Sequence, residues 1–433
     1  MTGPKASQAS TSRREFLKTT TAAAAGTAAL SLIPNAYARA GETIKVGLIG
    51  CGGRGRGAAE DICEAAGTSS NVKLHALADV FEDRVNDCYD FLKNNQNAKE
   101  KFDVDKERCF VGFDAFQKVT DCCDLVLLAT PPGFRPQHLA YAVTAGKHIF
   151  TEKPVAVDGP GIRKVLAVAE EAQRKDLAIV VGTQRRHQDS YLEAIARIHD
   201  GDVGDLVAGR VFWNQGNIWA HRRQPGWSDM EYQIRNWYHF VWLCGDCIVE
   251  QHIHILDVAC WALKGHPVRC VGMGGQEVNT APEYGESFDH FAVDYEFPGG
   301  VHVLSMGRQI DGCKSDVSQH LVGTKGAWSS SGGFRISGEG RRGRDRGRNR
   351  RNPYVQEQID LLEGIARGEP INELKQVAES NLTAIMGRMS AYTGQEVTWE
   401  QALESKLDTF PDKLEWGPRP EPVLAKPGTT ELI

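Results

Sequence analysis

The chain has 433 residues, with 56 acidic and 50 basic side chains and a formal net charge of −6 at pH 7. This acidic excess argues against a nucleic-acid-binding protein, so we expect no nucleic-acid partner. The length beyond the first forty residues exceeds what one hydrophobic core usually supports, which predicts two domains.

Residues 1–40 are typical of a targeting segment. Ser12-Arg13-Arg14-Glu15-Phe16-Leu17-Lys18 fits the twin-arginine export pattern, and a mildly apolar run from Thr19 to Pro34 follows it. That run is too short and too weakly apolar to span a membrane, so we expect no stable membrane insertion. We expect recognition by the twin-arginine export machinery and delivery to the periplasm or the cell exterior. The alternative is a disordered basic tail.

Residues 41–185 alternate short apolar runs with helical segments. Strands are expected at 43–50, 72–80, 124–130, 147–151 and 178–183, with a further strand–helix step near 109–119. Strands that alternate with helices in this way predict an N-terminal Rossmann domain, a doubly wound parallel sheet of the α/β class.

A glycine fingerprint, Gly50-x-Gly52-x-x-Gly55, ends the first strand and opens the first helix. In that context the glycines permit a tight turn, close approach of a pyrophosphate, and close packing of helix on sheet. The amides at the helix N-terminus would face the phosphates. The motif therefore predicts a dinucleotide-binding site, and Gly53 and Arg54 belong to the same loop.

Asp79 ends the second predicted strand, where a carboxylate can bond the adenosine ribose hydroxyls. It would repel a 2′-phosphate, which favours NAD over NADP, but the nearby Arg54, Arg56 and Arg84 leave NADP open. Later strands add further candidate cofactor-binding residues at the same sheet edge: Thr130, Pro131, His138, Glu152 and Lys153. His138 could instead be a helix-surface histidine.

Lys153, in Glu152-Lys153-Pro154, would stand beside the nicotinamide and suits acid/base work on a substrate hydroxyl. The alternative for this triplet is a solvated turn. A second candidate cluster spans 245–257, where one helix would place Glu250, His254 and Asp257 on a shared face.

His254 could act there as a general base, with a nearby carboxylate that fixes its tautomer. A metal site at His252, His254 and Asp257 is disfavoured, because His252 would fall on the opposite side of the helix. A structural helix with a buried histidine is the plainer alternative. Cys244-x-x-Cys247 has no second pair at zinc spacing, so we expect no metal and place most of the eleven cysteines in the core.

Residues 186–433 are expected to form an α+β domain with an open, mostly antiparallel sheet. Alternation at 291–297 and 301–303 around Pro298-Gly299-Gly300 predicts a hairpin, with partner strands at 206–214, 269–278 and 320–328. A flexible Gly/Arg-rich loop is expected at 329–352, followed by two helices within 353–394.

An aromatic-rich segment precedes the histidine cluster. Its candidates for substrate binding are Arg235, Trp237, Tyr238 and His239, joined by Asp257 from the predicted helix. Aromatic faces with convergent polar groups suit stacking against sugar rings. Hydrophobic core or an oligomer surface is an equal alternative for each aromatic residue.

Taken together, these motifs resemble the Gfo/Idh/MocA (glucose–fructose oxidoreductase / inositol dehydrogenase) family, and more narrowly its exported branch. The matching features are the glycine loop, Ala78-Asp79-Val80, Ala129-Thr130-Pro131-Pro132, Ala145-Gly146-Lys147-His148 with Glu152-Lys153-Pro154, and the 250–257 cluster. The resemblance implies that Lys153 is the catalytic lysine, that His254 is the acid/base histidine, and that the second domain often mediates oligomerisation. Glu250 stands where the family usually has Asp, and because its longer carboxylate could still contact a substrate hydroxyl, it is a third candidate catalytic residue.

The expected function is that of an exported NAD(P)-dependent oxidoreductase acting on a small-molecule carbohydrate or polyol. Export would separate the protein from the cytoplasmic NAD pool, so its cofactor should be tightly held and recycled within the catalytic cycle. One alternative is an NAD-dependent glycosidase that transiently oxidises a ring hydroxyl. Another is a sugar-binding module without catalysis.

Overall fold

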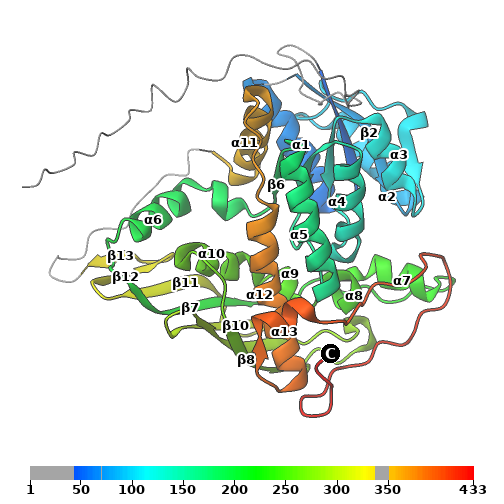
Figure 1. Cartoon of the computed structure of the whole chain (residues 1–433). Helices are drawn as coiled ribbons and strands as arrows, with labels where there is room; N and C mark the ends of the chain where they lie inside the picture. Colours follow the sequence, from blue (N-terminus) through cyan, green and yellow to red (C-terminus); the bar gives the residue numbers. More distant parts are fainter. Residues whose placement is uncertain (1–42, 70, 337–350) are drawn as a thin grey trace, which may run out of the picture. The chain divides into compact units, whose positions relative to one another are not determined.

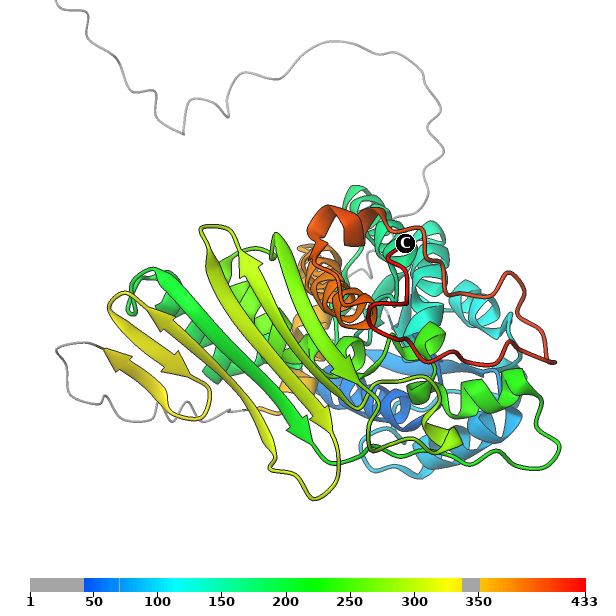
Figure 2. The same ribbon diagram turned by 90° about the horizontal axis from the view of Figure 1, so that it is seen from below.

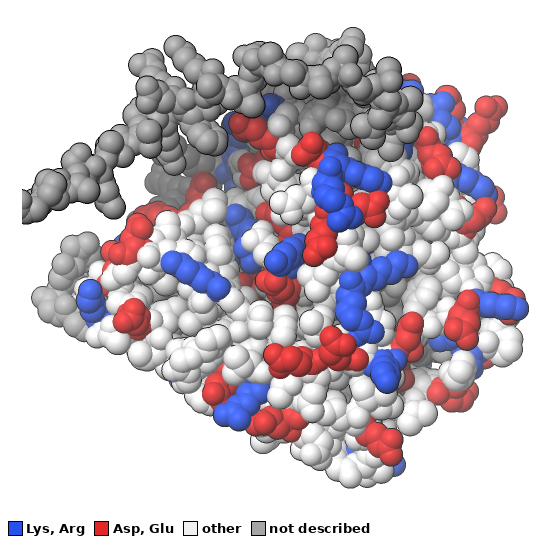
Figure 3. All heavy atoms as spheres, viewed as in Figure 1, with Lys and Arg blue, Asp and Glu red and all other residues white. Residues whose placement is uncertain are grey.

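The computed structural model describes residues 43–69, 71–336 and 351–433. The predicted export signal and the arginine-rich run at 341–350 lie outside these residues. Within the described part, no helix combines the length and apolar character needed to cross a bilayer. Acidic and basic side chains are interspersed over the face of the molecule shown in Figure 3.

The first half of the chain forms a six-stranded parallel sheet in the order β3-β2-β1-β4-β5-β6 (Figure 1). Its strands are β1 (Ile44–Ile49), β2 (Val72–Asp79), β3 (Cys109–Val111), β4 (Leu125–Leu128), β5 (His148–Thr151) and β6 (Ile179–Val181). Every residue of β4 and β5 is buried, as is typical of parallel strands covered by helices on both faces. This order and direction confirm the predicted Rossmann domain.

The helices of this half are α1 (Gly53–Ser69), α2 (Glu82–Asn94), α3 (Ala115–Cys122), α4 (Arg135–Thr144) and α5 (Gly159–Arg174). The strand order reverses between β1 and β4, so the chain leaves these two neighbouring strands toward opposite faces of the sheet. In sheets of this kind, ligands bind outside the carboxyl ends of the strands at that point.

The second sheet has eight strands in the order β13-β12-β11-β7-β10-β9-β8-β14. They are β7 (Leu206–Gln215), β8 (Arg269–Gly275), β9 (His290–Phe297), β10 (Val301–Gln309), β11 (Asp316–Gly323), β12 (Gly326–Ser329), β13 (Gly333–Ile336) and β14 (Val397–Thr398). All neighbours run antiparallel except β7 and β10, which confirms a mostly antiparallel sheet with the predicted β9–β10 hairpin. Figure 2 shows its strands side by side.

Two expectations about this sheet were wrong. The single strand predicted at 320–328 is two strands, β11 and β12, joined by a turn and paired with each other. The loop predicted from residue 329 includes β13, whose backbone pairs with β12 from Gly326↔Ile336 to Ser329↔Gly333. The sequence signal there is weak because a four-residue edge strand shows little alternation.

The remaining helical elements are α6 (Asp189–His199), α7 (Asp229–Arg235), α8 (Val241–Cys244), α9 (Cys247–Glu250), α10 (Ile253–Leu263), α11 (Pro353–Arg367), α12 (Leu374–Thr393) and α13 (Trp399–Glu404), with short 3-10 turns at Gln184–His187 and Trp237–His239. The two predicted C-terminal helices are confirmed as α11 and α12, and Gly394 (φ +73°) ends the second. α11 packs on α1, and its Val355, Ile359 and Leu362 join the same core as β1 and β2. α12 contacts both α5 and β8, so it links the two halves.

Candidate cofactor and active site

A cavity of about 540 Å³ lies at the reversal point of the Rossmann sheet, a size typical of ligand sites. The ends of β1 and β4 meet there, and the predicted residues Gly50, Gly52, Gly53, Arg54, Asp79, Thr130, Pro131 and His138 all line it. The structure therefore brings most of the predicted cofactor-binding residues to one place.

The glycine loop has the shape that a pyrophosphate needs. A Cβ added at Gly52 or Gly53 would meet nothing within 4 Å, so the backbone there is open to a ligand. Gly50 has φ +102° and Gly55 packs so tightly that a Cβ would lie 1.9 Å from the Gly50 carbonyl oxygen. The four glycines thus fit a dinucleotide. Gly52 and Gly53 leave space for the ligand, and Gly50 and Gly55 allow the tight turn.

Asp79 holds the loop as well as facing the cavity. Its carboxylate accepts hydrogen bonds from the amide of Cys51 (2.8 Å) and from that of Phe81 (3.1 Å). Burial raises the pKa of Asp79, although these amide bonds act in the opposite direction. The side chain is thereby oriented at the end of β2, where ribose hydroxyls bind in this fold.

His138 lines the cavity from α4. Its Nδ1 lies 3.3 Å from Thr130 Oγ1, and its ring stacks on Phe116 at a centroid distance of 4.2 Å. Burial, followed by the charge of Arg135, lowers the pKa of His138 to about 3. The ring is therefore neutral near pH 7 and contributes a flat, uncharged surface to the cavity wall.

Glu152 does not line the cavity. Its carboxylate accepts a hydrogen bond from Arg54 Nε, and Arg54 also pairs with Asp61 at 3.1 Å. Glu152 therefore anchors the arginine of the glycine loop, which connects that loop to the end of β5. Its direct contact with a cofactor stays a prediction.

Lys153 projects from the end of β5 to the second half of the chain. Its Nζ donates to Glu250 Oε1 (2.7 Å) and to the Glu250 carbonyl oxygen (2.6 Å), and both side chains are 9% exposed. The second carboxylate oxygen of Glu250 accepts from Gln251 Nε2 (2.6 Å). The two predicted catalytic residues are thus in direct contact, although neither lines the cofactor cavity.

The single helix predicted through residues 250–257 was wrong. α9 ends at Glu250 and α10 begins at Ile253, with a turn between them. The Glu250 carbonyl, which an unbroken helix would give to the amide of His254, is taken by Lys153 instead, and that amide bonds Gln251. The face-sharing argument therefore fails for Glu250 and His254.

His254 nevertheless lies near Lys153. Its imidazole stacks on Trp213 at a centroid distance of 5.4 Å, and the guanidinium of Arg185 covers the same indole at 5.4 Å. Burial, and then the positive charges of Lys153 and Arg185, hold the pKa of His254 well below its usual value. A neutral imidazole beside a lysine ammonium can exchange a hydrogen bond or a proton with a hydroxyl group.

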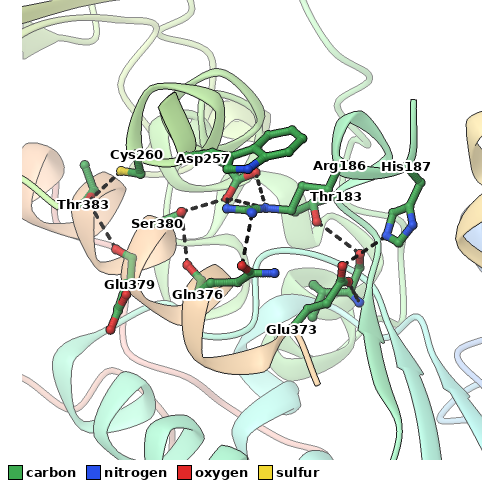
Figure 4. Close-up of polar contacts among 12 residues, drawn as sticks. Thr183, Arg186, His187, Asp257, Cys260, Glu373, Gln376, Glu379, Ser380 and Thr383 are labelled. Carbon is green, nitrogen blue, oxygen red and sulfur yellow. Dashed lines mark hydrogen bonds and ion pairs between the residues drawn. The ribbon is translucent and has the colours of Figure 1, made fainter. Parts of the chain in front are cut away.

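Asp257 takes part in a buried ion pair, shown in Figure 4. Arg186 donates to its two oxygens through Nη2 (2.8 Å) and Nε (2.9 Å), and Ser380 Oγ donates at 2.8 Å. Arg186 lies on a 3-10 turn, Asp257 on α10 and Ser380 on α12, so these contacts join three elements. In the same region, Nδ1 of His187 lies 2.6 Å from Asp360 Oδ2, and its Nε2 lies 3.3 Å from Glu373 Oε1. Contact between Asp257 and a substrate stays a prediction.

The aromatic segment divides between cavity and core. Arg235 and Trp237 line the cofactor cavity. Tyr238 is buried and its hydroxyl accepts from Gln309 Nε2 (2.6 Å), while His239 Nε2 donates to the Trp219 carbonyl (2.9 Å). The last two side chains are therefore held by structural hydrogen bonds.

Several lining residues were missed. Phe81 and Phe113 each come two residues after the end of a strand, β2 and β3, so their place near a strand end was a usable signal. His221 also lines the cavity but comes from the second half, and only the folded chain brings it there.

His252, part of the disfavoured metal alternative, packs its ring on Gly307. Among the residues that the structure describes, no group of three side chains is arranged to hold a metal ion.

Fold and site together define a two-domain dinucleotide-binding protein with a Rossmann domain and an open-sheet partner domain. Residues 44–195 match the family described as "Oxidoreductase family, NAD-binding Rossmann fold", and residues 191–329 match the "GFO/IDH/MocA C-terminal domain". The two matches span 44–329, more than half of the 433 residues. The chain belongs to the Gfo/Idh/MocA family, and its cofactor is NAD.

Three similar proteins illustrate the range of this family. The chain is 24% identical over 286 residues to an inositol 2-dehydrogenase of Rhizobium meliloti (66% of this chain, 74% of the relative). It is 25% identical over 246 residues to a glycosyl hydrolase family 109 protein of Shewanella baltica (52% and 49%). The crystal structure of scyllo-inositol dehydrogenase from Lactobacillus casei with bound NAD(H) and scyllo-inositol matches with a TM-score of 0.61 and 17% identity, covering 83% of this chain and all of that one.

Coverage of the curated relatives is incomplete. The chain spans about half the length of several of them, 44% for an uncharacterized oxidoreductase of Streptococcus pneumoniae and 56% for a 2,7-anhydro-N-acetylneuraminate hydratase of Escherichia coli. The structural match extends the shared fold over the whole of the scyllo-inositol dehydrogenase chain.

Proposed function

We propose that the protein oxidises a secondary alcohol of a polyol or carbohydrate, with NAD as hydride acceptor. The observation that carries this proposal is the contact of Lys153 with Glu250, with His254 nearby, at the sheet edge that also forms the cofactor cavity. The relatives named as inositol 2-dehydrogenases support a polyol-like substrate.

The number of N–H donors on Lys153 indicates how it could act on a substrate. An ammonium group has three N–H donors, and two of them bond Glu250. No further acceptor within the described chain takes the third, which is free for a substrate oxygen. There it would stabilise the negative charge that develops as the hydroxyl loses its proton.

His254 completes the arrangement. Because it is neutral, it accepts a hydrogen bond from the substrate hydroxyl and takes the proton as the carbonyl forms. NAD supplies the acceptor for the hydride that leaves the carbon. Glu250 holds the Lys153 ammonium in place through two hydrogen bonds, which gives its longer side chain a role in place of the usual Asp.

A library of polyols and sugars, incubated with the purified protein and NAD, tests the proposal. Mass spectrometry should find a product two mass units lighter than one library member, formed together with NADH absorbance. The same treatment with the Lys153→Met protein is the control. A protein that binds NAD but converts no library member, whatever the acceptor, would instead favour a sugar-binding module.

A second candidate function is glycoside cleavage by transient oxidation of a ring hydroxyl. The similarity to glycosyl hydrolase family 109 proteins favours it. In that case the hydride returns to the product and no net NADH forms. Chromogenic glycosides incubated without added NAD should then release their aglycone, whereas the dehydrogenase should leave them intact.

We also propose that the protein is exported by the twin-arginine pathway with NAD already bound. The motif Arg13-Arg14 and the apolar run after it support this. An exported protein would need to hold its cofactor and recycle it between two substrates. Replacing both arginines by lysine should leave the protein in the cytoplasmic fraction, and an unchanged distribution would contradict export by this route.

We propose that a second copy of the chain binds to the outer face of the eight-stranded sheet. Met273, Ala292, Met306 and Phe212 form one row across four neighbouring strands, with Met273 70% exposed. The described helices α10 and α12 pack on the other side. A row of apolar side chains in water is typical of an interface. Met273→Glu should lower the mass measured by light scattering to that of a monomer.

A further inference from the structure

The cofactor cavity is closed on one side by a segment from outside the Rossmann domain. Beyond Asp79, at the end where the adenosine binds in this fold, the wall continues with Phe81 and Phe113. Trp219, Ile234, Arg235 and Trp237 line the same cavity from the segment that follows β7. A nucleotide in this cavity is therefore enclosed by both halves of the chain.

Arg235 is attached to the Rossmann side of this wall. Its guanidinium lies 3.8 Å from the centre of the Phe81 ring and pairs with Asp83 at 3.0 Å. Glu231, one turn earlier on α7, holds the same guanidinium at 2.9 Å. The two carboxylates pair with the guanidinium and place it at the adenosine end of the cavity, while a contact of Arg235 with a sugar stays a prediction.

A third part of the chain reaches the same place. Trp416, in the segment after α13, contacts the ring of Phe113 at 4.7 Å and that of Phe81 at 5.6 Å. Phe81 thus touches the guanidinium of Arg235 and the indole of Trp416. Aromatic and cation–π contacts of this kind each stabilise a closed arrangement modestly, and together they act on one ring.

The C-terminal segment is itself fastened to α7. The amide of Met230 donates to the Gly417 carbonyl (3.1 Å), and the amide of Arg419 donates to Asp229 (3.1 Å). The guanidinium of Arg419 lies 4.9 Å over the Trp242 ring. In Figure 1 this red segment runs past α8 and α7. The cavity wall is therefore covered by two layers, α7 and the C-terminal segment bound to it.

We propose that Arg235 and Trp416, closing on Phe81 and Phe113, form an adenosine clamp that retains NAD. The flat walls of Phe81, Phe113 and Trp219 suit a heteroaromatic base. Release of the nucleotide requires α7 and the C-terminal segment to separate from the Rossmann domain, rather than one loop to move. The clamp rests on the proposed function, for which it supplies the means of keeping a cofactor that cannot be exchanged.

The release rate of NADH tests the clamp. Protein loaded with NADH is mixed with excess NAD, and the loss of energy transfer from tryptophan to NADH is followed with time. Trp416→Ala and Arg235→Ala should each release NADH about tenfold faster than the unmodified protein, since each loses contacts worth roughly one factor of ten. Trp416→Phe should restore slow release, because it keeps an aromatic ring against Phe113.

The matched control is Val423→Ala, in the same C-terminal segment but 82% exposed, which should release NADH at the unmodified rate. Thermal unfolding shows whether each variant is folded. If an alanine variant is not, Arg235→Lys decides, since it keeps a charge near Asp83 but loses the flat contact with Phe81. Faster release by that variant supports the clamp.

Unchanged release in the folded variants overturns the clamp, even where NADH binds well to the unmodified protein. A protein without affinity for NADH would overturn the proposed function instead. The two failures are therefore distinguishable in one experiment.

Discussion

Replacing Lys153 by methionine should abolish turnover while NAD still binds. The Lys153 ammonium bonds Glu250 twice and keeps one N–H donor for the substrate oxygen. Loss of such assistance to proton transfer lowers rates by about 10²–10⁴. NAD should stay bound, because the glycine loop and Asp79 lie on the cavity wall and Lys153 does not.

The same substitution should also destabilise the fold, and a second variant separates the two effects. Lys153→Met leaves the Glu250 carboxylate, 9% exposed, without its cation, which costs about 3–5 kcal/mol of unfolding free energy. Lys153→Met combined with Glu250→Gln removes both charges and should regain most of that stability. It should not regain turnover, since the donor is still missing.

Single-turnover NADH formation and urea unfolding are measured for the unmodified protein, Lys153→Met, the double variant and one control variant. The control is Lys118→Met, because Lys118 pairs with Asp114 at the surface (48% and 60% exposed) and should change neither measurement by much. Turnover by Lys153→Met within about threefold of the unmodified rate would refute the assignment. Recovery of turnover together with stability in the double variant would make Lys153 a structural residue.

Two further predictions concern the ion pairs near α12. Burial opposes the charge of His187, but Asp360 and Glu373 raise its pKa to about 10, from an ordinary value of 6.5. A raised pKa contributes stability that is complete below pH 6.5 and lost between there and pH 10, so the urea midpoint should fall over this range. His187→Gln should flatten that pH dependence, and an equally steep fall in the variant would assign it to other groups. Asp257→Asn should cost about 3 kcal/mol by leaving Arg186 unpaired, seen as a lower melting temperature; a raised KM at unchanged stability would place Asp257 at the substrate instead.

The Rossmann half was predictable because its signals are local. Buried parallel strands appear as uninterrupted apolar runs, and the glycine fingerprint sits between a strand and a helix whose types can be assigned from neighbouring residues. The run at 125–128 is buried throughout, as its composition predicts. The same logic recovered the β9–β10 hairpin, since Gly299 and Gly300, both at positive φ, mark the turn.

In the candidate site, the sequence was least informative where a distant residue decides the local structure. The helix predicted through 250–257 is broken because Lys153, 97 residues earlier, takes the Glu250 carbonyl. The spacing of residues 250–257 does not reveal that Arg186 and Ser380 bind the carboxylate of Asp257, whose contact with a substrate stays a prediction. Trp416 reaches the adenosine end only because the C-terminal segment is tied to α7. Contacts between such distant residues cannot be predicted from the periodicity of a short stretch of sequence.

The packing of α11 on α1 affects how the chain is made. The apolar side of α1 is covered by residues that a ribosome adds some three hundred positions later, so the first domain cannot finish its interior during its own synthesis. Until α11 emerges, that surface needs a chaperone or stays open to water. Completion of the nucleotide-binding half is therefore a late event in synthesis, coupled to the arrival of α11.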